Sequence, residues 1–99
     1  MKRLSAETFS SFISEGDIAA VMFGSPTGEA TMEQAIEFAD TWKRRRDVGF
    51  GYVDAFEQVA LTRSFSIRVL PTTLVLRDGK VVARYEGRHS LSVLDSCRR

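Results

Sequence analysis

The chain has 99 residues, which fits one small domain, so the sequence predicts a single domain over residues 1–99. Hydrophobic residues make up 43% and charged residues 27% of the chain, which is typical of a globular protein and excludes a disordered one. The formal net charge is only +1, whereas proteins that bind nucleic acid or a membrane surface typically carry a large positive excess, so neither partner is expected.

Strand and helix patterns alternate in the first part of the chain. Residues 2–4 suit a short strand. Phe9, Phe12 and Ile13 recur at helical spacing and predict one buried face of a short helix. The continuous apolar run 18–23 indicates a central strand that is buried on both of its faces.

Residues 27–46 predict the longest helix. An apolar stripe recurs there at spacings of three and four residues and consists of Met32, Ala35, Ala39 and Trp42, with Ile36 and Phe38 flanking it. A stripe of this kind is typical of a helix face that packs on a core.

The second part of the chain predicts a strand, a short helix and a hairpin. Residues 48–55 suit the strand and residues 56–64 the helix. Asp78 and Gly79 separate two strand-like runs, and both residue types tolerate the positive φ of a tight hairpin turn. A short terminal helix is expected from Ser90. This order predicts an α/β fold with parallel strands and an antiparallel hairpin at one edge.

The most specific segment is residues 65–80, which read Phe-Ser-Ile-Arg-Val-Leu-Pro-Thr-Thr-Leu-Val-Leu-Arg-Asp-Gly-Lys. This run resembles the thioredoxin family, in which an aromatic residue, an isoleucine and a Pro-Thr pair precede an apolar strand and a glycine turn. Gly87 falls where that family keeps a glycine after its last strand. The resemblance covers nearly the whole chain and implies a thioredoxin fold, with a central mixed sheet flanked by helices on both faces.

In thioredoxins the proline of this run is cis and lies beside the redox loop, and the resemblance implies the same of Pro71. Such a bond would leave the backbone of Leu70 free to pair with an extended peptide. The alternative is that Pro71 only shapes the turn that enters an edge strand. Leu70, Pro71 and Thr72 are therefore candidate binding residues.

The Cys-Gly-Pro-Cys motif of the family corresponds here to Thr27-Gly28-Glu29-Ala30. Threonine forms no thiolate, and alanine cannot resolve a mixed disulfide. Val21 stands where the family buries an acid beneath the redox pair. The sequence therefore predicts no catalytic residue and no oxidoreductase activity. The four loop residues are candidates for a recognition surface opposite the proline, or Thr27 simply caps the helix while Glu29 complements its dipole.

A redox-inactive protein-binding module or chaperone is the main hypothesis, with another protein or an extended peptide as its partner. Hydrogenase-maturation chaperones share the degenerate redox loop and a Gly-x-His after the last strand, here Gly87-Arg88-His89. That resemblance implies a role in maturation of a hydrogenase small subunit.

Two other function classes remain open. One is a glutathione-linked enzyme of non-dithiol type that uses the Thr27 hydroxyl, although the acidic-serine pair usual in such enzymes is missing. The other is a structural or assembly subunit, in which a sheet edge or the region around Trp42 forms a homo-oligomer.

The remaining residues indicate no cofactor and no metal. Cys97 is the only cysteine, which excludes an intramolecular disulfide and a zinc site built on several cysteines. His89 lacks an obvious partner and is interpreted as a surface residue. The basic run 43–46 is interpreted as the solvated end of the long helix. No stretch is apolar enough for a signal peptide or a membrane span, so a cytoplasmic location is expected.

Overall fold

The computed structural model describes residues 2–91. Its elements are β1 (Lys2–Arg3), α1 (Phe9–Ser14), β2 (Ile18–Gly24), α2 (Glu29–Arg44), β3 (Val48–Asp54), α3 (Val59–Ser64), β4 (Thr72–Arg77) and β5 (Lys80–Glu86). This order is the predicted one. The terminal helix expected from Ser90, and Cys97 with it, fall on residues beyond the described ones.

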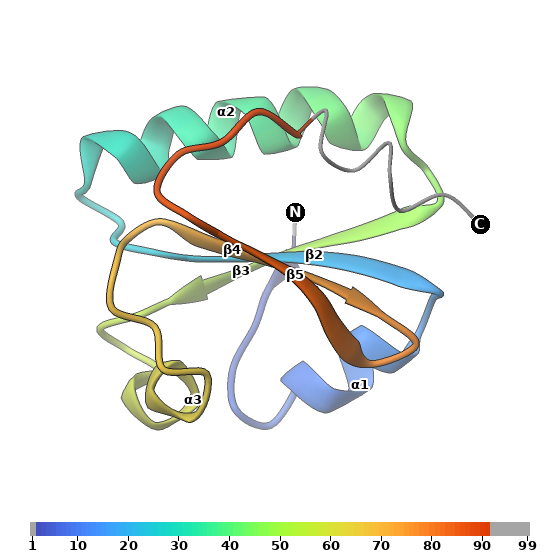
Figure 1. Cartoon of the computed structure of the whole chain (residues 1–99), viewed down its shortest axis with the longest axis horizontal. Helices are drawn as coiled ribbons and strands as arrows, with labels where there is room; N and C mark the ends of the chain where they lie inside the picture. The colour runs from blue at the N-terminus through green and yellow to red at the C-terminus, as the bar shows by residue number, and fades with distance from the viewer. Residues whose placement is uncertain (1, 92–99) are drawn as a thin grey trace.

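The five strands form one mixed sheet in the order β1-β3-β2-β4-β5. β2 is parallel to β3, and β3 is parallel to β1, whereas β4 runs antiparallel to both β2 and β5. Helix α2 covers one face of the sheet, and α1 and α3 cover the other (Figure 1). The α/β prediction with helices on both faces is therefore confirmed.

Two apolar cores lie on the two faces because strand side chains alternate between them. The core beneath α2 contains Ile18, Ala20, Met22, Phe38, Val48, Phe50, Val75 and Leu91. The core beneath α1 and α3 contains Leu4, Phe9, Phe12, Ala19, Val21, Phe23, Val53, Leu74 and Leu76. β2 contributes to both cores and is buried along its whole length, as its continuous apolar run predicts.

Helix α2 does not pack on the sheet through the stripe that its sequence suggests. Its buried residues are Thr31, Gln34, Phe38 and Thr41. Met32 is 58% exposed and Trp42 is 45% exposed, and Ala39 is exposed as well. The prediction that this stripe faces the core is therefore wrong, apart from half-buried Ala35.

Tertiary contacts explain this rotation of α2. Phe38 packs edge-on against Phe50, with ring centroids 5.3 Å apart. The Gln34 side chain accepts a hydrogen bond from the backbone N–H of His89 over 2.8 Å, and the backbone N–H of Leu91 donates to the Glu37 carboxylate. Two polar side chains of α2 thus bind the segment after β5. The apolar periodicity of the helix sequence does not predict these polar contacts.

The β4–β5 hairpin has the predicted turn. Asp78 has φ of 52° and Gly79 has φ of 79°, so both turn residues are left-handed, as a tight hairpin with a right-handed twist requires. Among residues 2–91 no helix combines the length and the apolar character needed to cross a bilayer.

Candidate functional site

Three segments of the chain meet around Gly24, at the carboxyl end of β2. Gly24 pairs with Asp54 at the end of β3. On the other side of β2, Phe23 pairs with Thr72, so the antiparallel register puts Gly24 beside Pro71. The loop into α2, the end of β3 and the start of β4 therefore lie at one edge of the sheet (Figure 1).

The loop before α2 forms a turn that ends at Gly28. The Gly28 N–H donates to the Ser25 carbonyl over 3.0 Å, and the helix begins at Glu29 with Gly28 at the N-cap and no side-chain cap. The prediction that Thr27 caps the helix is therefore wrong. Thr31 instead reaches back from the first turn, and its hydroxyl accepts a hydrogen bond from the Ser25 N–H over 3.1 Å. Thr27 is left exposed.

The peptide bond between Leu70 and Pro71 is cis, as the resemblance implies. Within residues 2–91 the backbone N–H and C=O of Leu70 take part in no hydrogen bond. Their neighbours are paired, because the Gly87 N–H donates to the Pro71 carbonyl over 2.7 Å and the Thr72 hydroxyl donates to the Val69 carbonyl. Leu70 therefore presents a donor and an acceptor between two anchored residues.

Arg84 of β5 holds the loop that leads to the cis bond. Its guanidinium donates to the carbonyls of Phe65 and Ser66 over 2.6 and 2.7 Å. The Phe65 ring packs against the rings of Phe9 and Phe23, with centroids 5.3 and 5.8 Å away. Arg84 of the hairpin and the Phe65 ring in the core thus both hold this loop in place, and with it Leu70.

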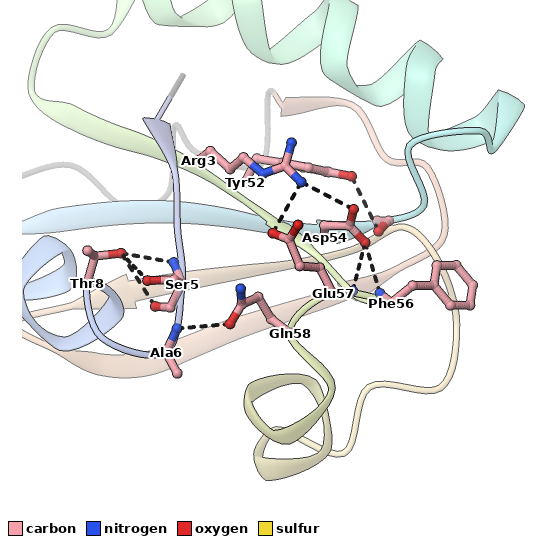
Figure 2. Close-up of polar contacts among 10 residues, drawn as sticks. Arg3, Ser5, Ala6, Thr8, Tyr52, Asp54, Phe56, Glu57 and Gln58 are labelled. Atoms are coloured by element: carbon pink, nitrogen blue, oxygen red, sulfur yellow. Dashed lines mark hydrogen bonds and ion pairs between the residues drawn. The ribbon is translucent and has the colours of Figure 1, made fainter.

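Large apolar side chains lie exposed on the segments that meet at this edge. We call the exposed side chains Phe56, Val59 and Val69 the apolar rim: Phe56 follows β3, Val59 begins α3 and Val69 precedes β4, and Phe56 is 70% exposed. Figure 2 shows Phe56 pointing away from the sheet just after β3. Exposed apolar groups near unpaired backbone groups are typical of surfaces that bind extended peptides.

The thioredoxin family model matches residues 1–97. The chain belongs to the thioredoxin family. No curated protein matches the chain.

Solved thioredoxins share its fold throughout. Thioredoxin from Plasmodium falciparum superposes with a TM-score of 0.87 at 24% identity, covering 98% of this chain and 95% of its own. Thioredoxin from Fasciola hepatica superposes with a TM-score of 0.88 at 22% identity, and the match covers 97% of this chain and 95% of that one. Thioredoxin f2 from Chlamydomonas reinhardtii superposes with a TM-score of 0.86 at 22% identity, and the match covers 98% of this chain and 92% of that one.

None of the loop residues 27–30 is a cysteine. Thr27 and Ala30, which the resemblance aligns with the two cysteines, lie on the loop and in the first turn of α2. Glu29 lies between them, where the helix dipole favours its carboxylate. Val21, at the position of the buried acid, is completely buried in the core beneath α1 and α3. None of these four side chains carries a thiol.

The predicted binding residues differ in how far they are exposed. Thr27 and Glu29 are exposed, and Leu70 is half-buried in the loop opposite them. Pro71 is buried, and Thr72 is completely buried with its hydroxyl turned to the Val69 carbonyl. Thr72 therefore supports the loop from within. Gly28 and Ala30 are half-buried at the start of α2.

Sequence reasoning missed a polar network at the end of β3. The buried carboxylate of Asp54 accepts hydrogen bonds from the N–H groups of Phe56 and Glu57 over 2.9 and 3.1 Å, and Arg3 of β1 lies 3.4 Å from its second oxygen (Figure 2). Arg3 also pairs with Glu57 over 3.2 Å. An aspartate that ends a strand before two amide donors is a turn signal, so this bend was readable in the sequence.

Tyr52 joins this network to the loop before α2. Its hydroxyl donates to the Gly24 carbonyl over 3.4 Å. Burial raises the pKa of the Tyr52 phenol above its ordinary value of 10.0, and the carboxylates of Asp54 and Glu57 raise it further, while Arg3 lowers it. The neutral phenol is therefore the form that the folded chain favours.

We expect the raised pKa of Tyr52 to make the chain less stable at alkaline pH. The folded state holds the phenol proton to a higher pH than the unfolded state, so the contribution of Tyr52 to the free energy of unfolding is constant below about pH 10 and is lost as pH rises through the folded pKa. The free energy of unfolding of Tyr52→Phe, measured by urea denaturation, should fall less steeply than that of wild type between about pH 9 and about pH 11. Parallel slopes for the two chains would contradict this expectation.

Proposed function

We propose that this chain is a redox-inactive, protein-binding member of the thioredoxin family that acts as a chaperone. It holds an extended segment of its partner beside Leu70 and exchanges no disulfide with it. The observation that carries this proposal is the unpaired backbone of Leu70 at a cis proline, opposite a loop in which Thr27 and Ala30 replace the two cysteines.

The surroundings of Leu70 support strand-like pairing with a peptide. An extended segment gains affinity from main-chain hydrogen bonds and specificity from side-chain contacts. Leu70 supplies the backbone groups, and the apolar rim supplies exposed surface at the same edge. Because Arg84 and Phe65 anchor the loop, little ordering is required when a peptide binds, which favours affinity.

A hydrogenase small subunit is the partner that we propose for this chaperone. The support is the resemblance in the Gly87-Arg88-His89 segment and in the degenerate redox loop. Gly87 adopts φ of 80° and donates to the Pro71 carbonyl, so this segment begins directly beside the proposed peptide site.

The test is capture of partners from the source cells, followed by binding of a purified hydrogenase small subunit. We expect Val69→Asp and Leu70→Asp to lose at least tenfold in affinity, because a carboxylate in an apolar contact is desolvated without a partner. Val69 is exposed, so its variant should keep the wild-type thermal stability. Val82→Asp, at the exposed edge strand β5, is the matched control.

Three results would contradict the proposal. Equal binding by wild type, Val69→Asp and Leu70→Asp would move the partner to another surface. Reduction of insulin disulfides by the wild-type chain would show that it retains redox turnover. A thermal shift on adding millimolar glutathione, lost in Thr27→Ala, would favour the glutathione-linked alternative.

A further inference from the structure

Helix α2 carries an apolar stripe that the fold leaves exposed. We define the α2 stripe as Met32, Ile36, Ala39 and Trp42, all of which are exposed. Spacings of three and four residues place these side chains along one side of the helix. Ile36, at its centre, is 72% exposed. Since the buried face of α2 is formed by other residues, the α2 stripe is surface that the core does not use.

An apolar pocket lies at the amino end of the α2 stripe. It has a volume of about 220 Å³ and is lined by Met22, Pro26, Thr31, Met32, Ala35 and Tyr52. Met22, Ala35 and Tyr52 belong to the core beneath α2, whereas Leu70 packs against the core on the opposite face of the sheet. The pocket therefore lies on the opposite face of the sheet from Leu70, and its residues Pro26 and Thr31 flank the loop 27–30.

The two ends of α2 have opposite charge. Glu29 and Glu33 lie at the amino end, and Lys43 and Arg46 lie at or just past the carboxyl end. None of these four side chains forms an ion pair within residues 2–91. The Arg46 guanidinium carbon lies 5.7 Å from the centroid of the Trp42 ring, so Arg46 lies over Trp42 at the carboxyl end of the stripe.

We propose that the α2 stripe binds a second copy of this chain, with the two α2 helices antiparallel about a two-fold axis. Trp42 of each copy then enters the pocket of the other. At 1.5 Å rise per residue, Met32 and Trp42 are about 15 Å apart along the axis, so a two-fold axis between residues 36 and 39 places each tryptophan opposite a pocket.

Charge selects this arrangement over the others. An antiparallel pair sets the acidic end of each α2 against the basic end of its partner at both ends of the interface, while a parallel pair would bring like charges together. The stripe is self-complementary, which is what an isologous dimer needs. A partner of different sequence would not have to match the chain's own spacing in this way.

The experiment is sedimentation of the full chain from micromolar to millimolar concentration, with tryptophan emission recorded in parallel. Trp42 is the only tryptophan, so its emission reports the interface directly. We expect a monomer–dimer equilibrium, with emission moving to shorter wavelength as the dimer forms. The double variant Lys43→Glu and Arg46→Glu should weaken the dimer at least tenfold, and adding Glu29→Lys and Glu33→Lys should restore it.

The matched control is Val82→Ala, since Val82 is exposed on β5 at the far edge of the sheet. A strict monomer throughout this range, with constant Trp42 emission, overturns the proposal. A dimer that survives the Lys43 and Arg46 reversals but is lost in Val82→Lys also overturns it, because that dimer forms through the β5 edge. These substitutions lie on the surface, so thermal melts should show that each variant folds.

Discussion

Phe38→Ala is expected to lower the free energy of unfolding by about 3–5 kcal/mol. Phe38 is completely buried, and its ring meets the ring of Phe50 edge-on at 5.3 Å. Truncation loses the transfer free energy of a whole ring and leaves a cavity between α2 and the sheet. Urea denaturation should show a lower midpoint with an unchanged slope.

Two further variants test whether the loss reflects the observed packing of α2, in which Phe38 is buried and Ile36 is exposed. Phe38→Leu keeps most of the buried volume and should cost about 1 kcal/mol. Ile36→Ala removes a side chain that is 72% exposed and should stay within about 0.5 kcal/mol of wild type, measured where the chain is monomeric. A larger loss for Ile36→Ala than for Phe38→Ala would mean that α2 packs on the sheet through the side that carries Ile36, and would contradict the observed packing.

Asp54→Ala is expected to lower the free energy of unfolding by about 2 kcal/mol. The Asp54 side chain is only 10% exposed and accepts the N–H groups of both Phe56 and Glu57. Removing it leaves two amide donors without their acceptor at the point where the chain turns from β3 toward α3. Chemical denaturation of the variant measures the loss.

Asp54→Asn and Arg3→Ala separate the hydrogen bonds from the ion pair. The asparagine keeps an oxygen that accepts amide hydrogen bonds, so it should recover about half of the loss. Arg3 has a side chain that is 59% exposed, and its removal should cost less than about 1 kcal/mol. Equal losses for Asp54→Asn and Asp54→Ala would assign the effect to charge and contradict this account.

The Asp54 turn also bears on the proposed function. It sets the direction in which the chain leaves β3 and therefore the position of Phe56 in the apolar rim (Figure 2). If the rim contacts the partner peptide, Asp54→Ala should weaken partner binding more than Arg3→Ala does.

Local pattern alone predicted most of the fold. The apolar run of β2, the Asp78-Gly79 turn and the order of helices and strands all appear in the sequence because they depend on neighbouring residues. The resemblance in residues 65–80 predicted the cis bond before Pro71, and the structure confirms it. The sequence also shows directly that the Cys-Gly-Pro-Cys motif is missing, since a chain with one cysteine cannot contain a pair of redox cysteines.

The tertiary structure decided which side of α2 is buried and which groups at the candidate site are available. Helical periodicity reports apolar residues but not the polar contacts of Gln34 and Glu37 with the segment after β5, which lies more than fifty residues away. The unpaired backbone of Leu70 and the burial of Thr72 likewise follow from pairing between distant strands. Local residue types determine which elements form, whereas the partner that each face meets is set only when the chain folds.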